Sequence, residues 1–267
     1  MSRESAMSKE GAAVQVTINN HVAVLTMNNP PANTWTKDSL NQLKEAITAL
    51  NINKNVYALV ITGQGEKFFS AGADLNVFAS GDKGIAIEMA QAFGAAFETL
   101  SAFRGVSIAA INGYAMGGGL EVALACDIRV AEAHAVLALP EAKVGLLPCA
   151  GGTQNLTWLV GEGWAKRIIL CGERVTASQG LDIGLVEEVV GSGLGLEAAT
   201  KLAESVAHQS PSSVTACKEL IQNCRSAPLH HGLMKERELF IRLFDTKDQK
   251  EGVNAFLEKR PPKWMNE

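Results

Sequence analysis

The chain has 267 residues, of which 47% are hydrophobic and 19% charged, and it carries a formal net charge of −4. This size allows one large core or two domains, and the acidic balance argues against a large nucleic-acid interface, which needs a basic face. No stretch reaches the roughly 18 uninterrupted apolar residues of a membrane span, and five scattered cysteines without CxxC spacing favour a reduced, cytoplasmic setting.

The first hundred residues alternate between expected strands and helices. In chain order we expect a disordered tail over 1–12, a β-hairpin over 13–28, a helix over 37–51, a strand over 56–63, a loop over 64–78 and a helix over about 84–102. The tail lacks the apolar core of a secretory signal. Asn19 and Asn20 mark the hairpin turn, and Thr36 is a typical helix N-cap.

Near residue 195 the predicted elements change from a mixture of strands and helices to helices alone. We expect strands over 106–112, 127–133, 135–139 and 186–190, a buried helix over 120–126, and two or three helices between about 152 and 184. From about 196 onward the pattern predicts helices only, after a Gly/Ser-rich hinge at 190–196. The sequence therefore predicts an α/β catalytic core over 13–195 and a helical oligomerisation region over 196–267.

The most informative segment of the chain is a glycine triplet at 117–119, between an expected strand and an expected helix. Three glycines at a helix start leave backbone N–H groups open to a ligand, at the positive end of the helix dipole. Such a site stabilises negative charge on an oxygen. Glu121 follows within one helical turn, and Glu141 lies 20 residues further on. Two carboxyls beside these amides indicate proton transfer next to a carbonyl group.

Each of these features also has a purely structural interpretation. The triplet suits close packing of a helix end against a strand, and Glu121 suits a helix cap or an ion pair with an arginine. Glu141 follows Pro140, so it also fits an acid in a first helical turn. The combination with the rest of the chain decides between these interpretations.

Four segments together resemble the enoyl-CoA hydratase/isomerase (crotonase) family, from about residue 14 to 264. They are AGADL at 71–75, INGYAMGGGLEVALACDIRVA at 111–131, PEAKVGLLPCAGGTQNL at 140–156 and EGVNAFLEKRPP at 251–262. The resemblance implies a spiral of repeated β-β-α units followed by a helical trimerisation region. It also implies a homotrimer, or a hexamer built from two trimers.

The resemblance also implies a catalytic site. The backbone N–H groups of Ala73 and Gly118 match the oxyanion hole that binds a thioester carbonyl. Glu121 and Glu141 match the two glutamates that hold a water molecule in the hydratase branch. Because this sequence has both glutamates, the resemblance favours an enoyl-CoA hydratase, which is a hydro-lyase that forms 3-hydroxyacyl-CoA. No cofactor or metal is implied, because coenzyme A is part of the substrate.

The same resemblance assigns residues to coenzyme A. Ala71, Gly72, Asp74 and Leu75 match the loop near adenine and pantetheine, with Asp74 organising the loop. Phe256 and Lys259 match positions that reach coenzyme A from a neighbouring subunit, although Lys259 equally suits a solvated cation at a helix end. The family setting is fatty acid metabolism, including β-oxidation, but the residues specify neither pathway nor acyl-chain length.

Two departures from the family pattern stand out. Cys149 occupies a position where the family often has glycine, and a positive φ there would cost roughly 1 kcal/mol. We expect an inert thiol, because no basic residue adjoins it in the sequence. The loop at 29–36 is one residue shorter than the common pattern.

His230 and His231 resemble a pair of metal ligands only superficially, because the sequence places no third ligand nearby.

Two alternatives to a hydratase remain open. In a Δ3-Δ2-enoyl-CoA isomerase, or another crotonase-type acyl-CoA enzyme, one glutamate would move a proton without water. A coenzyme A-binding or nucleic-acid-binding protein without catalysis is the alternative from a different class. The acidic pI of about 5.8 and the retained glutamates argue against it.

Overall fold

The computed structural model describes residues 5–6 and 11–267, and its main layer is a seven-stranded sheet. The order is β1 (Ser5–Ala6), β2 (Val14–Asn19), β3 (Val22–Met27), β4 (Ala58–Gly63), β6 (Val106–Ile111), β8 (Ile128–Glu132) and β11 (Glu188–Val190). The first three strands pair antiparallel, and every pair from β3 onward is parallel. Strands β4 and β6 are almost wholly buried, as parallel strands covered on both faces should be.

A second, four-stranded sheet is built from short strands. Its order is β10 (Val175–Thr176), β9 (Val136–Ala138), β7 (Tyr114–Met116) and β5 (Phe68–Ser70). Each of β5, β7 and β9 directly follows a parallel strand of the main sheet and precedes a helix. The chain therefore winds through repeated β-β-α units, which confirms the predicted crotonase-like spiral.

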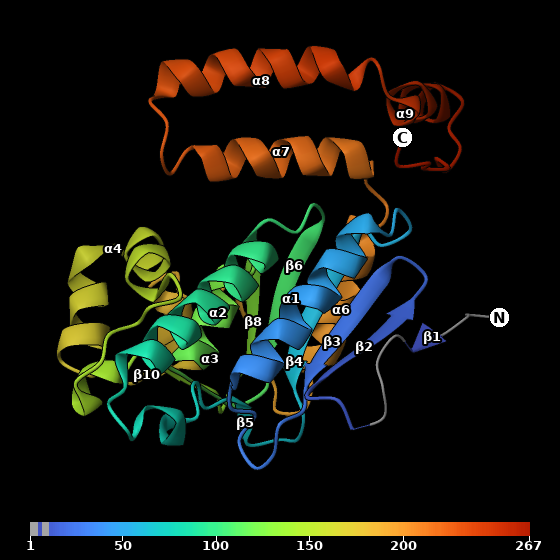
Figure 1. Ribbon diagram of the computed structural model, residues 1–267. Helices are drawn as coiled ribbons and strands as arrows, with labels where there is room; N and C mark the ends of the chain where they lie inside the picture. The colour runs from blue at the N-terminus through green and yellow to red at the C-terminus, as the bar shows by residue number, and fades with distance from the viewer. Residues whose placement is uncertain (1–4, 7–10) are drawn as a thin grey trace.

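Helices pack around the two sheets. They are α1 (Lys37–Ile52), α2 (Lys83–Ser101), α3 (Gly118–Ala125), α4 (Gly152–Leu170), α5 (Ala177–Asp182) and α6 (Gly195–Val206), with the 3-10 turns η1 (Leu75–Phe78) and η2 (Glu141–Val144). Helices α1 and α2 lie in front of the sheet and α6 lies behind it (Figure 1). Thr36 caps α1 in a reciprocal arrangement with Ser39. Among the described residues, no helix is long and apolar enough to span a membrane.

Several predicted elements differ from the structure. The segment 64–78, predicted as loop, contains β5 and η1, and β7 directly follows the turn at Asn112–Gly113. These strands of three residues are too short to show a period and depend on pairing with each other. The predicted tail over 1–12 lies mostly outside the described residues, although Ser5–Ala6 pairs with β2.

The boundary between core and C-terminal region also lies later than predicted. Helix α6 begins at Gly195 and packs on the main sheet, where Ala199 and Ala203 are fully buried. The part that stands apart consists of α7 (Pro211–Asn223), α8 (Leu229–Leu243) and α9 (Lys247–Leu257). We call these three helices the C-terminal arm. Figure 1 shows α7 and α8 side by side beyond the sheet, with α9 at one end.

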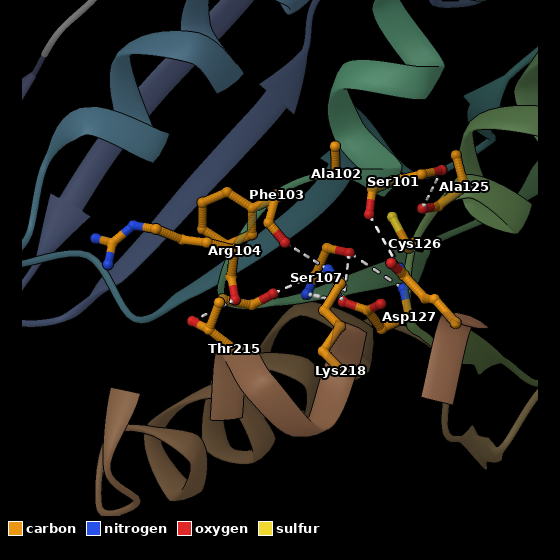
Figure 2. Close-up of polar contacts among 12 residues, drawn as sticks. Ser101, Ala102, Phe103, Arg104, Ser107, Ala125, Cys126, Asp127, Thr215 and Lys218 are labelled. Atoms are coloured by element: carbon orange, nitrogen blue, oxygen red, sulfur yellow. Dashed lines mark hydrogen bonds and ion pairs between the residues drawn. The ribbon is translucent and has the colours of Figure 1, made fainter. Parts of the chain in front are cut away.

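A polar contact ties the C-terminal arm to the core (Figure 2). The Lys218 ammonium on α7 donates to the Phe103 carbonyl at 2.6 Å and to the Asp127 carboxylate at 2.7 Å. The Thr215 hydroxyl donates to the Arg104 carbonyl at 3.0 Å. Phe103 and Arg104 follow the end of α2, and Asp127 follows the end of α3, so the arm is fixed to the core where these two helices end.

Candidate active site

The glycine triplet occupies the junction between β7 and α3. Gly117 has a φ of 53°, a conformation that favours glycine, and its N–H donates to the Ala138 carbonyl at 2.9 Å. All eight residues of α3 are buried. Gly118 is the first of them, and its N–H donates to no other group among the described residues. The triplet therefore presents a free amide at a buried helix start, as predicted.

The loop after β5 brings a second free amide to this place. Gly72 has a φ of 87°, and a Cβ built on it would lie 3.1 Å from the Gly118 nitrogen and 2.6 Å from the Met116 oxygen. The loop and the triplet are thus in direct contact. Within the described part of the chain, the Ala73 N–H also lacks a partner. The loop therefore brings Ala73 close to the triplet that contains Gly118, and their role as two donors to one oxygen stays a prediction.

Trp35 contacts both of these segments. The backbone N–H of Trp35 donates to the Gly72 carbonyl at 2.8 Å, and the backbone carbonyl of Trp35 accepts from the Asp74 N–H at 3.1 Å. Its buried indole lies against the Cα of Gly118, since a Cβ there would be 3.4 Å from Trp35 Cδ1 and 2.9 Å from Phe93 Cε1. Trp35 therefore fixes the loop and the triplet relative to each other.

Glu121 lies on α3 and is only 3% exposed. One carboxylate oxygen, Oε1, accepts hydrogen bonds from the N–H groups of Ala150 at 2.8 Å and Gly152 at 2.9 Å. Burial raises the pKa of this carboxyl, and the two amide hydrogen bonds oppose the rise. The sequence contained the donors, in the segment CAGG at 149–152, but gave no sign that they hold Glu121.

Glu141 approaches the same place from η2. A Cβ on Gly117 would lie 3.0 Å from Glu141 Oε1, so the carboxyl lies against the triplet. Its other oxygen, Oε2, is buried and has no hydrogen-bond partner among the described residues. Burial, followed by the negative charge of Glu121, raises the pKa of Glu141 to about 7. The two carboxyls are therefore close enough to interact.

Cys149 faces this pair of glutamates. Its thiol is exposed, yet partial burial and the charges of Glu121 and Glu141 raise its pKa to about 11. A thiol with such a pKa is protonated at neutral pH and is a poor nucleophile. Cys149 is not one of the non-glycine residues with positive φ, so it adopts this backbone without the strain considered above.

The remaining predicted residues divide into two groups. Asp74 caps η1 by accepting from the Asn76 N–H at 3.0 Å, and Leu75 beside it is 53% exposed. Ala71 donates its N–H to the Ala32 carbonyl at 2.9 Å, which anchors the same loop. These residues belong to the same loop as Ala73, and their predicted contact with coenzyme A stays a prediction.

Phe256 and Lys259 are not part of this cluster within one chain. Phe256 is 83% exposed near the end of α9, which lies away from α3 (Figure 1). Their predicted contact with coenzyme A in a neighbouring subunit stays a prediction. Among the described residues, no group of three or more His, Cys, Asp or Glu side chains is placed to hold a metal ion.

Comparison with known proteins places this geometry in a family. The model of the family described as enoyl-CoA hydratase/isomerase matches residues 17–267. The chain belongs to the enoyl-CoA hydratase/isomerase family. It is 41% identical to the 2,3-dehydroadipyl-CoA hydratase of Escherichia coli K12 over 242 residues, covering 90% of this chain and 94% of that protein.

Solved structures that are similar to this chain have the same fold. A structure of Pseudomonas aeruginosa DspI matches with a TM-score of 0.94 and 62% sequence identity, over 97% of this chain and 99% of that one. An enoyl-CoA hydratase from Bacillus anthracis matches with a TM-score of 0.92 and 37% identity, over 96% and 100% of the two chains. The fold predicted from four sequence segments is thereby confirmed.

Proposed function

We propose that the protein is an enoyl-CoA hydratase that adds water to trans-2-enoyl-CoA and forms 3-hydroxyacyl-CoA. One observation carries the proposal: two glutamates with different environments lie together beside two unpartnered amides. Relatives named 2,3-dehydroadipyl-CoA hydratase and crotonyl-CoA hydratase, at 41% and 36% identity, support the same reaction class.

The environments of the two carboxyls suggest their roles. Glu121 accepts two amide hydrogen bonds, which favour its ionised form. Glu141 has a pKa of about 7 and an unpartnered oxygen, which favour its protonated form near neutral pH. Such a difference within a pair of carboxyls assigns base and acid, although the pair titrates as a unit. We therefore assign Glu121 as the base and Glu141 as the acid.

The proposed reaction adds water across the C2–C3 double bond of the enoyl group. Glu121 takes a proton from water while the water oxygen forms a bond to C3 of the enoyl group. The C2–C3 π electrons move toward C1, and the thioester oxygen becomes an enolate held by the Ala73 and Gly118 amides. Glu141 then gives its proton to C2, and the thioester carbonyl re-forms. A proton passing from Glu121 to Glu141 restores the starting state. The residues need no cofactor for this addition.

The test is a hydration assay with the purified protein. Trans-2-butenoyl-CoA should lose the ultraviolet absorbance of its conjugated thioester, and 3-hydroxybutanoyl-CoA should appear in equal amount. If the protein instead converts 3-enoyl-CoA to 2-enoyl-CoA and leaves 2-enoyl-CoA unhydrated, the Δ3-Δ2-enoyl-CoA isomerase is the correct function. Absence of both reactions would contradict the catalytic proposal.

The C-terminal arm supports self-association as part of the proposed function. Large apolar side chains on its three helices are exposed; they include Ile221 (70%), Leu229 (78%), Met234 (65%), Phe240 (62%), Ile241 (67%) and Phe256 (83%). Exposed apolar surface on this scale marks an interaction site. We propose a trimer, or a dimer of trimers, in which the arm brings Phe256 and Lys259 to a neighbouring substrate. Sedimentation should show an oligomer at micromolar concentration, and a monomer would contradict this part. The proposed setting is cytoplasmic fatty acid metabolism.

A further inference from the structure

A buried serine, Ser70, lies where the loop after β5 begins, and no step of the proposed reaction uses it. It is the last residue of β5 and is fully buried. Its hydroxyl donates to the Asn33 carbonyl at 2.7 Å and accepts from the Gly72 N–H at 3.2 Å. A serine hydroxyl donates one hydrogen bond and accepts others, so both contacts exist at the same time. Ser70 therefore joins the loop over 29–36 to the loop that carries Ala73.

The backbone of Ser70 also contacts the glycine triplet. A Cβ built on Gly119 would lie 2.1 Å from the Ser70 carbonyl oxygen and 2.9 Å from the Ser70 Cβ. A side chain at position 119 would therefore push Ser70 out of its place, and glycine permits this close approach of two backbones. Ser70 thus contacts three segments at once, namely the loop over 29–36, the loop after β5 and the triplet.

The two peptide planes that meet at Gly72 are held by different groups. The plane before its Cα carries the Gly72 N–H, which donates to the Ser70 hydroxyl. The plane after it carries the Gly72 carbonyl, which accepts from the backbone N–H of Trp35 at 2.8 Å. This second plane also contains the Ala73 N–H, which points opposite to the Gly72 carbonyl because the peptide is planar and trans. Contacts on both sides of Gly72 therefore set the direction of the Ala73 N–H.

The glycine at position 72 makes these contacts necessary. Gly72 has a φ of 87°, and glycine has more backbone freedom than any other residue. A stiffer residue does not fit, since a Cβ here would lie 2.6 Å from the Met116 carbonyl oxygen. The chain therefore orients this loop by hydrogen bonds and not by a restricted residue.

We propose that Ser70 is a positioning residue for the oxyanion hole: its hydroxyl holds the peptide plane before Gly72 and so directs the Ala73 N–H at the thioester oxygen. The proposal rests on the oxyanion role proposed for Ala73. It does not require that the reaction be hydration, since any reaction through a thioester enolate uses the same amide. Without the hydroxyl, the Gly72 N–H and the Asn33 carbonyl would lose a buried partner. Gly72 would then adopt several orientations, and the Ala73 amide would stabilise the enolate less.

The kinetic test replaces Ser70 by alanine and follows the hydration of trans-2-butenoyl-CoA. Ser70→Ala should lower kcat about tenfold and change KM by less than about twofold, because a misdirected amide loses most where the charge on the oxygen is largest. Ser107→Ala is the matched control. Ser107 is also a fully buried strand serine, and its hydroxyl makes two hydrogen bonds to Asp127. The control should keep the wild-type kcat.

A spectroscopic measurement reports on the oxyanion hole without any reaction. The probe is 4-dimethylaminocinnamoyl-CoA, whose amino group is conjugated with the thioester carbonyl. Its aromatic ring stabilises the double bond against hydration, so the probe persists when it is bound. Hydrogen bonds to the thioester oxygen stabilise negative charge there, so the wild-type protein should shift the absorbance maximum to longer wavelength. Ser70→Ala should reduce this shift by about half or more, whereas Ser107→Ala should keep it.

A purely structural role for Ser70 would lower the melting temperature and leave the absorbance shift unchanged. If alanine prevents folding, Ser70→Cys is measured instead, because a thiol fills a similar volume but is a weak donor and acceptor. This variant should also reduce the shift. An unchanged shift in either folded variant would overturn the proposal, whatever its kcat.

The shift also separates this proposal from the hydratase function. A reduced shift in Ser70→Ala, in a protein that hydrates no enoyl-CoA, would support the role of Ser70 and contradict only the hydration reaction. Hydration by the wild-type protein with no shift of the bound probe would contradict the oxyanion role of Ala73, and with it the role of Ser70.

Discussion

The two glutamates reach the same place from regions of different character. Glu121 lies on α3, where all eight residues are buried, and two amides hold its carboxylate. Glu141 lies on η2, which contains no buried residue, and one of its buried oxygens has no partner among the described residues. The comparison shows how one site obtains carboxyls in two environments: a buried helix holds one through two amide hydrogen bonds, and a surface turn presents the other with an unpartnered oxygen.

The largest expected effect comes from removing either carboxyl. Glu121→Gln and Glu141→Gln should each lower kcat for hydration at least about 10²-fold, because each change removes a proton-transfer partner. Binding of a saturated acyl-CoA, measured by calorimetry, should change little. Near-normal turnover in either variant would contradict the two-glutamate mechanism. Loss of hydration with retained 3-enoyl isomerisation would favour the isomerase.

The next effect concerns the amide at the start of α3. Gly118→Pro removes the N–H assigned to the thioester oxygen and should lower turnover by about 10²-fold. Proline is tolerated in a first helical turn, so the melting temperature is the control for folding. A folded variant with normal turnover would show that other donors hold the enolate.

Gly118→Ala should affect the protein in a different way from Gly118→Pro. Alanine keeps the N–H and adds a methyl group at this position. In the structure the Cβ would lie 2.9 Å from Phe93 Cε1 and 3.4 Å from Trp35 Cδ1, so it points into the aromatic cluster. Alanine would therefore disturb the packing of these rings before it obstructed substrate.

A smaller effect should follow from displacing Glu121 while keeping its donors. A Cβ on Gly152 would lie 2.8 Å from Glu121 Oε1 and 2.8 Å from Pro148 Cβ. Gly152→Ala should therefore shift the carboxylate and lower kcat about tenfold, since misplacement by about an ångström costs up to 10²-fold. Gly163→Ala on the same helix meets nothing within 4 Å and is the control. Equal rates for the two variants would show that the position of Glu121 is not critical.

The glycine triplet and Glu121 could be selected from the sequence because they form a local pattern. The glycine triplet, Glu121 and the helix that follows lie within a few residues, so spacing alone indicated their shared chemistry. The amides of Ala150 and Gly152 lie 29 and 31 residues from Glu121 in the sequence, and no local pattern reports such a contact. The contact between Trp35 and Gly118 was missed for the same reason.

In the fold, too, elements with a local sequence pattern were predicted, whereas elements that depend on distant partners were not. Helix α1 was predicted from its period and its Thr36 cap, both of which are local. Strands β5 and β7 were missed, because three residues form a strand only when a distant partner supplies the hydrogen bonds. The position of α6 on the sheet was missed because its amphipathic pattern fits a core and an oligomer interface equally well.

The smallest expected effect is on the pH dependence of stability. Folding raises the pKa of Glu141 from 4.5 to about 7, so in this window the folded state binds more protons than the unfolded state. The stability that Glu141 gives to the folded state is fully present below pH 4.5 and is lost as the pH rises through about 7. Glutamine cannot ionise, so Glu141→Gln should gain melting temperature relative to wild type between pH 5 and pH 8, by a few degrees. Glu197→Gln, on the exposed surface of α6, should show no such trend in parallel thermal melts. An equal pH dependence for wild type and Glu141→Gln would mean that Glu141 is as well solvated as a surface carboxyl. The contrast between the two glutamates would then lose its physical basis.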